Sequence, residues 1–254
     1  MHILELWQFP VKGFGGSQVG TATLATDGYF PHDRYFAIST GGEIIATAKP
    51  GTWFPKAHFL QLMSNEALAE YSCQYLTDVN TPMLKLSHRG RSCVAINPDN
   101  ADGRRQLEDF IFNNFRDQLR GQPRLMRMKN QAFSDQSTAL VSIASNASLN
   151  TFADATGTVP SNSRFRINII INADKAFAEA DMIGRTFQCG NALMMVQKPV
   201  GRCAAINVDP ITAVRSKNDY VRLMRENFGH SNLGVFAKVI NDGEIKVGDE
   251  LRPI

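Results

Sequence analysis

The sequence has few cysteines, and none of them forms a close pair. The four thiols among its 254 residues are Cys73, Cys93, Cys189 and Cys203, with no C-x-x-C unit. A structural zinc site or an iron–sulfur cluster built by this chain alone is therefore not expected. In a reducing compartment all four cysteines should be free thiols.

Long apolar runs and strong charge are also missing. The longest apolar candidate, Ile167–Ile171, has the length of a strand, whereas a helix that spans a bilayer needs about 20 apolar residues. The N-terminal residues MHILELWQFPVK lack the pattern of a signal peptide. A net charge of +3 without a concentrated basic face does not favour nucleic-acid binding. We therefore expect a cytoplasmic protein with no membrane span and no nucleic-acid partner.

Most of the chain has the pattern of short strands bounded by turns. The predicted strands are Ile3–Phe9, Val19–Thr26, Arg34–Ser39, Glu43–Ala48, Phe59–Met63, Leu68–Tyr75, Phe165–Ile171, Thr186–Cys189, Ala192–Lys198, Ala204–Val208, Val235–Ile240 and Glu244–Leu251. Asp242 and Gly243 predict a tight hairpin between the last two. Alternation along the strands places Cys73 in the core, and Cys93 and Cys189 have similar apolar surroundings.

Three helices interrupt the strands. An apolar stripe that includes Leu107, Ile111 and Phe115 predicts a helix ending near Gly121. A second helix should begin after Ser145, and a third should end at Gly229. Because helices and strands do not alternate regularly, the fold class is mainly β with a few helices, as a barrel or sandwich. The punctuation GQPR at 121–124 predicts a domain boundary there.

Polar clusters stand near the starts of several strands. Lys12 lies beside a glycine-rich turn whose spacing fits neither common phosphate loop, so a turn with an exposed lysine is the favoured interpretation. Arg34 could pair with Asp33 or direct its guanidinium at a phosphate. The segment SDQS at Ser134–Ser137 predicts a capped turn.

Two arginine-containing segments carry the strongest chemical signals. In RFRINIII, strand alternation would place Arg164, Arg166 and Asn168 on one face, directed at solvent or at an anionic ligand. In GRCAAINVDP, Arg202 precedes Cys203, and a neighbouring cation favours the thiolate, which is a nucleophile and a soft metal ligand. The five histidines carry no protease signature. These residues alone leave a functional thiol and a core thiol equally open.

The order of these segments resembles a known family. FPVKGFGG, HDRYFAI, SDQS with ASLN, FRINIII, GRCAAINVDP and GEIKVGDEL resemble the MOSC superfamily from one end of the chain to the other. The likeness is to two-part members, such as the mitochondrial amidoxime-reducing component and its bacterial relatives. It implies an N-terminal β domain over 1–122, with a boundary good to about ten residues, and a MOSC β-barrel over 123–254.

The resemblance implies a molybdenum cofactor, with Cys203 as metal ligand and catalytic residue. The cofactor-binding residues that it implies are Lys12, Gly13, Arg34, Asp135, Gln136, Ser137, Arg166, Asn168, Gly201, Arg202 and Cys203. Four positions depart from the family pattern. Gly13 replaces a serine, Ile167 a proline, Val200 a first cysteine and Phe236 a tyrosine.

The implied activity is reduction of small N-hydroxylated or N-oxide compounds. The C-x4-C-x2-C pattern of a ferredoxin domain is absent from the sequence, so electrons should come from a separate ferredoxin- or flavin-reductase-type protein. One alternative is a carrier of persulfide sulfur or of molybdenum cofactor that has no reductase activity. Another is a non-catalytic module that binds an anion through Lys12, Arg34 and Arg166.

Overall fold

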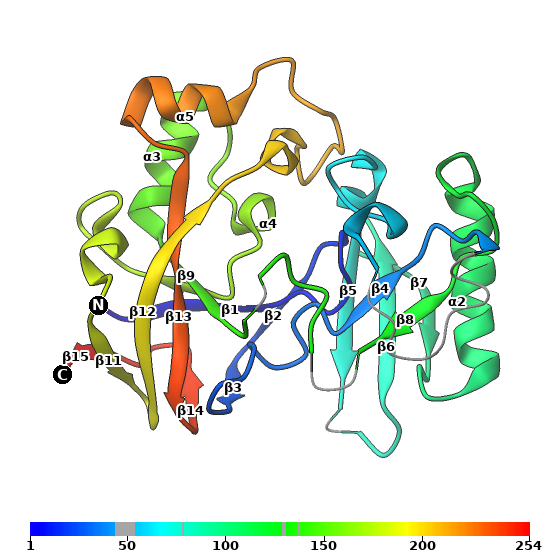
Figure 1. Ribbon diagram of the computed structural model, residues 1–254, viewed down its shortest axis with the longest axis horizontal. Coiled ribbons are helices and arrows are strands. Elements are labelled where there is room, and N and C mark those ends of the chain that lie inside the picture. Colours follow the sequence, from blue (N-terminus) through cyan, green and yellow to red (C-terminus); the bar gives the residue numbers. More distant parts are fainter. Residues whose placement is uncertain (44–53, 78, 129–130, 137) are drawn as a thin grey trace.

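A computed structural model describes residues 1–43, 54–77, 79–128, 131–136 and 138–254. The chain is mainly sheet with a few helices, as the sequence predicts (Figure 1). The strands of the first half are β1 (Ile3–Gln8), β2 (Ser17–Val19), β3 (Thr21–Leu24), β4 (Phe36–Ile38), β5 (Tyr71–Leu76), β6 (Met83–His88), β7 (Arg91–Ile96) and β8 (Leu125–Arg127). Those of the second half are β9 (Val141–Ser145), β10 (Ile169–Ile171), β11 (Thr186–Cys189), β12 (Ala192–Gly201), β13 (Asn232–Asn241), β14 (Gly243–Lys246) and β15 (Leu251–Pro253).

Helices connect or cover these strands. The α-helices are α2 (Ala101–Asn114), α3 (Asn146–Thr156), α4 (Asn162–Phe165) and α5 (Tyr220–Phe228). Short 3-10 helices are η1 (Lys56–His58), η2 (Glu66–Glu70), η3 (Arg116–Gln118), η4 (Ala178–Met182) and η5 (Ala204–Asn207). Ser145 caps α3 as predicted, because its side chain accepts a hydrogen bond from the Ser148 amide. Gly229 ends α5 in the left-handed conformation, also as predicted.

The largest sheet closes into a barrel. Its strand order is β15-β11-β12-β13-β9-β10-β1-β2, with β10 and β9 parallel and the other neighbours antiparallel. At the β15 end of this order, the Ile3 amide donates to the Asp249 carbonyl at 2.9 Å, and the Leu251 amide donates to the Met1 carbonyl at 2.7 Å. Because β15 thereby joins the start of β1, the predicted β-barrel is confirmed.

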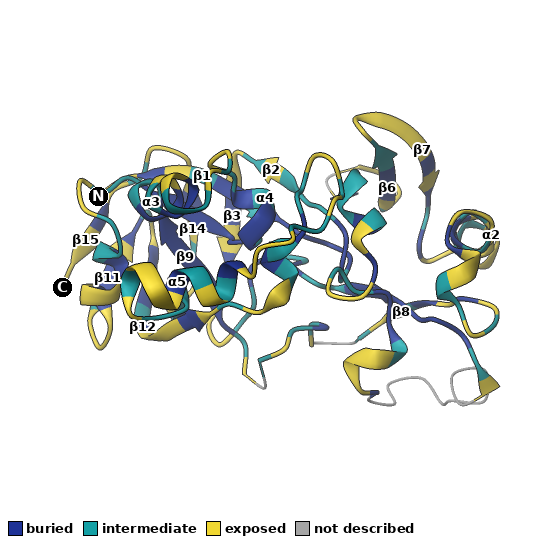
Figure 2. Cartoon of the chain, turned by 90° about the horizontal axis from the view of Figure 1, so that it is seen from above, coloured by how far each residue is buried: buried dark blue, intermediate teal, exposed yellow. Residues whose placement is uncertain are grey.

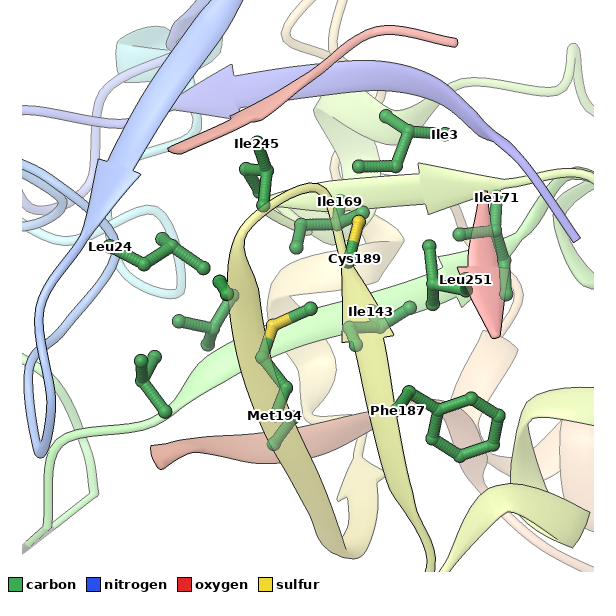
Figure 3. Packing of buried hydrophobic residues seen from close by; sticks show 14 of the residues in the cluster. Ile3, Leu24, Ile143, Ile169, Ile171, Phe187, Cys189, Met194, Ile245 and Leu251 are labelled. Atoms are coloured by element: carbon green, nitrogen blue, oxygen red, sulfur yellow. The ribbon is translucent and has the colours of Figure 1, made fainter. Parts of the chain in front are cut away.

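The barrel interior is filled by aliphatic side chains. Figure 3 shows Ile3, Ile143, Ile169 and Met194 directed toward one another from different strands. Cys189 lies in the same cluster without solvent exposure, as predicted, and burial raises the pKa of its thiol to about 12. That thiol is a packing group at neutral pH.

A second apolar cluster lies around the three-stranded sheet β5-β6-β7. Helix α2 packs against it with Leu107 and Ile111, while its outer face is exposed at the far end of the molecule (Figure 2). The helix stops at Asn114 and not near Gly121, so the predicted C-terminus was wrong. Phe115 turns inward to pack on Phe14, with ring centroids 6.3 Å apart, and this burial ends the helical path.

The predicted hairpin at Asp242 and Gly243 was wrong. Strand β14 pairs with β3 and not with its sequence neighbour β13. The Asp242 carboxylate accepts hydrogen bonds from the amide and hydroxyl of Thr26, each at 2.6 Å, and so holds the turn against the segment after β3. Other predicted strands also differ. Residues 204–207 form η5, Phe59 makes only an isolated bridge, and 44–48 lie outside the described residues.

The predicted boundary near 122 stays a prediction, and the first strands extend across the molecule. Figure 1 shows β1 running from the barrel toward the three-stranded sheet, which brings the glycine-rich turn after it between the two clusters. Strand β8 pairs with β4. In the described part of the chain no helix is long and apolar enough to cross a membrane.

Replacing Phe14 by alanine should destabilise the protein by about 3–5 kcal/mol, because this fully buried ring contacts both Tyr71 and Phe115. Leu4→Ala is the control, since Leu4 is 41% exposed and should cost under about 1 kcal/mol. Urea denaturation followed by circular dichroism measures both. Equal losses in the two variants would contradict the packing described here.

Candidate functional site

A cavity of about 530 Å³ lies where the barrel end meets the N-terminal region. Almost every residue that the sequence places in a cofactor site lines it: Lys12, Gly13, Arg34, Asp135, Gln136, Arg166, Asn168, Gly201, Arg202 and Cys203. Ser137 lies outside the described residues. The volume is within the range of about 300–1,000 Å³ typical of small-molecule sites.

The cavity lining is strongly cationic. Its described charged residues are Lys12, Arg34, Lys56, Arg164, Arg166, Lys198 and Arg202, against Asp33 and Asp135. A concave surface with an excess of one charge concentrates the field and attracts ligands of the opposite sign. The arrangement therefore favours an anionic ligand.

Lys12 is mostly buried, so its interpretation as an exposed lysine was wrong. Its ammonium donates to the Phe133 carbonyl at 2.9 Å and to Asp135 at 3.0 Å, and the side chain is 12% exposed. Burial lowers the pKa of Lys12, although Asp135 raises it in part. The contact also holds the segment at 133–136 over the cavity.

Arg34 forms the predicted pair with Asp33, and its role in binding a phosphate stays a prediction. Its guanidinium pairs with Asp33, donates to the carbonyl of Arg166 at 2.9 Å and also lines the cavity. Asp33 in turn accepts from the Phe9 amide at 3.1 Å. The Arg34 guanidinium lies 5.0 Å from the centre of the Phe9 ring.

The predicted strand around Arg166 was wrong, although its residues do reach one site. Residues Asn162–Phe165 form α4, and Arg166 follows in the left-handed conformation with φ of 59°. The Asn162 side chain closes this turn through the amide and carbonyl of Ile167, at 2.9 and 2.8 Å. Such local side-chain bonds compete with strand formation, which strict alternation does not reveal.

The three polar side chains of this segment have different environments. Arg164 is 4% exposed and donates to the Ile206 and Val208 carbonyls at 2.8 and 2.9 Å, and it pairs with Asp209 at 2.9 Å. Asn168 is bonded to the amide and hydroxyl of Ser142. These bonds fix two strand ends at the cavity wall.

Arg166 brings a largely buried guanidinium to the cavity lining. It donates to the Phe14 carbonyl, and burial together with the positive charge of Arg34 lowers its pKa to about 9. Its guanidinium lies 4.9 Å from the centre of the Phe9 ring, which Arg34 also contacts.

Cys203 lies between the end of β12 and the start of η5. Its thiol is exposed and lines the cavity, whereas burial raises the pKa of Cys73 well above its ordinary value. The predicted core positions of Cys73 and Cys189 are confirmed. The prediction for Cys93 was wrong, because this residue is exposed on β7, an edge of the three-stranded sheet.

Arg202 holds the backbone around this thiol. It donates to the Phe165 carbonyl at 2.9 Å and, through Nε, to the Leu233 carbonyl at 3.0 Å. Burial lowers its pKa to about 9. The guanidinium therefore joins β12, β13 and α4 at the edge of the cavity.

Sequence reasoning missed several residues that line or support the site. Lys56 and Lys198 add charge to the lining, and the hydroxyl of Ser142 fixes Asn168. Arg215 donates to the Met63 carbonyl at 3.0 Å and so joins the loop after η5 to the segment before η2, which Figure 1 shows side by side. Two features of the sequence could have indicated these residues. Lys198 lies in the same segment as Cys203, and Ser142 is a polar residue inside the apolar run 140–144.

Two family models together match most of the chain. A family model of the MOSC domain matches residues 129–252, and a model of the MOSC N-terminal beta barrel domain matches residues 1–111. The chain belongs to the MOSC family. Of the cavity lining, Cys203, Arg166 and Asp135 lie in the MOSC domain, while Lys12 and Arg34 come from the N-terminal domain.

Among solved structures, the matches include two bacterial proteins. YUAD from Bacillus subtilis is 13% identical over 98% of this chain and 93% of its own, with a TM-score of 0.46. YiiM from Geobacillus stearothermophilus is 16% identical over 45% of this chain and 53% of its own, with a TM-score of 0.35. This chain therefore spans about half of the YiiM chain. A search of curated proteins finds no match.

Replacing Lys12 by methionine should change how stability depends on pH. Burial holds the pKa of Lys12 in the folded protein below its ordinary value of 10.5. At pH values between the folded and the ordinary pKa, the unfolded chain therefore binds more protons than the folded chain. The stability of the wild type should therefore rise, relative to Lys12→Met, as the pH increases toward 10.5. Urea denaturation at a series of alkaline pH values measures the difference. Parallel curves would show that the ammonium is not buried as described.

Proposed function

We propose that the cationic cavity binds molybdenum cofactor, with Cys203 as the protein ligand of the metal. One observation carries the proposal: an exposed thiol and the cations Lys12, Arg34 and Arg166 line the same cavity. Thiolate sulfur is a soft ligand, and guanidinium groups bind phosphate oxygens in pairs. The donor set therefore fits a phosphorylated pterin whose metal needs one more sulfur.

Each cavity residue has a role that follows from its position. Arg34 and Arg166 can hold an anionic group, since Phe9 and backbone carbonyls keep their guanidinium groups in place. Lys12 can exchange its contact with Asp135 for a phosphate. Gly13 has φ of +87°, and a Cβ there would lie 2.9 Å from the Leu60 carbonyl, so the family's serine does not fit this backbone.

We further propose that the protein reduces N-hydroxylated or N-oxide compounds. The bound cofactor would supply the two-electron chemistry. The balance for a hydroxylamine is R–NHOH + 2 e⁻ + 2 H⁺ → R–NH₂ + H₂O, so the N–O bond breaks and oxygen leaves as water. The electrons come from a separate donor of the ferredoxin or flavin-reductase type. The protein would hold the cofactor and the substrate and keep other molecules out of the cavity.

A second candidate function has a specific observation in its favour. Cys203 is exposed, and a carrier of persulfide sulfur needs an accessible thiol. The two functions make different demands on the cavity, because a carrier does not need the cofactor to remain bound. Metal content therefore separates them.

Replacing Cys203 by alanine should abolish stable molybdenum binding. Wild-type protein made in a host that synthesises the cofactor should contain close to one molybdenum per chain, measured by inductively coupled plasma mass spectrometry. Cys93→Ala is the matched control, since Cys93 is also an exposed free thiol but lies on β7. Equal metal content in the two variants, or none in any protein, would overturn the proposal.

Arg166→Gln should lower cofactor retention by about tenfold, because hydrogen bonds to a charged group contribute about 1.5–3 kcal/mol. Retention is measured as molybdenum and pterin remaining after dialysis at increasing salt. Arg222→Gln is the control, since Arg222 is exposed on α5 and pairs with Glu226 of the same helix. A loss of the same size in both variants would contradict a role for the cavity cations.

Reduction of benzamidoxime or a similar N-hydroxylated compound, with reduced methyl viologen as donor, then tests the reductase activity.

A further inference from the structure

One peptide group next to the site is held between a buried carboxylate, that of Glu179, and the partly buried guanidinium of Arg202. The carbonyl of Leu233 accepts from Nε of Arg202 at 3.0 Å, and the amide of the next residue, Gly234, donates to Oε1 of Glu179 at 3.2 Å. Arg202 and Glu179 therefore bind opposite ends of the same peptide group. The peptide dipole is aligned with both charges, because the cation of Arg202 lies at the negative carbonyl oxygen and the carboxylate of Glu179 lies at the positive amide.

Neither charge has a direct ionic partner within the part of the chain that the structure describes. Glu179 on η4 is only 1% exposed, and its second oxygen accepts from the Ser148 hydroxyl at 2.9 Å. An uncompensated buried charge is strongly destabilising. The shared peptide group allows the carboxylate and the guanidinium to compensate one another without contact.

The backbone at Gly234 is restricted to this orientation. Its φ is +85°, and a Cβ there would lie 2.7 Å from the Ile143 carbonyl, so only glycine fits. This conformation directs the Gly234 amide at Glu179 in η4 and the preceding carbonyl at Arg202. The remaining bond of Arg202, to Phe165, extends the connection to the turn that carries Arg166.

We propose that Glu179 is a positioning residue for the turn that carries Cys203. Its carboxylate fixes the Leu233–Gly234 peptide group, this group fixes the guanidinium of Arg202, and Cys203 is the next residue in the chain. The importance of this position for a metal ligand rests on the proposed function. The coupling between Glu179 and Arg202 does not, so it is tested on protein without cofactor.

The test is a double-mutant cycle with Glu179→Gln and Arg202→Met, followed by urea unfolding. Each single variant should lower the folding equilibrium constant by some factor. If the two sites were independent, the double variant would lower it by the product of the two factors. We expect a loss about tenfold smaller than that product. Glu108→Gln is the matched control, because Glu108 is also buried and accepts from a backbone amide, that of Leu125, but lies on α2. Its cycle with Arg202→Met should be multiplicative. A multiplicative cycle with Glu179→Gln would overturn the proposal.

Hydrogen exchange tests the position of the turn separately from global stability. In folded Glu179→Gln, amides in 200–206 and 231–235 should exchange about tenfold faster than in Glu108→Gln. Identical exchange in these two segments would also overturn the proposal. If Glu179→Gln alone does not fold, the double variant provides the test, because the coupling predicts that it folds. An unfolded double variant, together with a folded Arg202→Met, would contradict the coupling. Retained coupling with no molybdenum in the wild type would overturn only the proposed function.

Discussion

The site depends on holding like charges close together inside the protein. Arg34 and Arg166 contact the same Phe9 ring at 5.0 and 4.9 Å, and one donates to the backbone carbonyl of the other. Burial and this neighbouring charge lower the pKa of Arg166. Asp33, carbonyl oxygens and the aromatic face offset part of the repulsion. An anionic ligand would offset the rest, so the energy of its binding includes relief of a repulsion present before it arrives.

The backbone is also strained at the two residues that carry these charges. Arg34 and Arg166 both have positive φ, at 50° and 59°, which costs roughly 1 kcal/mol or more for a side chain with a Cβ. Each conformation is held by bonds from distant segments, such as that from the Arg34 amide to the Phe9 carbonyl. The barrel and the N-terminal region together fix these two turns. This explains why a cavity formed by short turns can keep a defined shape.

Much of this arrangement could be predicted from sequence, and the failures have local physical causes. Caps at Ser145 and Gly229 identified two helices, because capping depends on neighbours in the chain. The order of motifs predicted residues that line one cavity. Alternation failed at Arg166, where the side chain of Asn162 closes a turn instead. The carbonyl partners of Arg202 lie 31 and 37 residues away, so no local pattern indicates that this arginine supports the backbone.

The lining of the cavity, more than its thiol, distinguishes the functions considered for it. A persulfide carrier and a metal ligand both need an accessible sulfur, and Cys203 meets that need in either case. A persulfide carrier, however, gains nothing from a group of cations in the same cavity as the thiol. Lys12 and Arg34 come from a different domain from Cys203, and both are held near other cations, Arg34 also at the cost of backbone strain. Such an arrangement is useful when an anion of some length must reach from the cations to the sulfur and stay bound. A phosphorylated cofactor joined to a metal has that shape and charge.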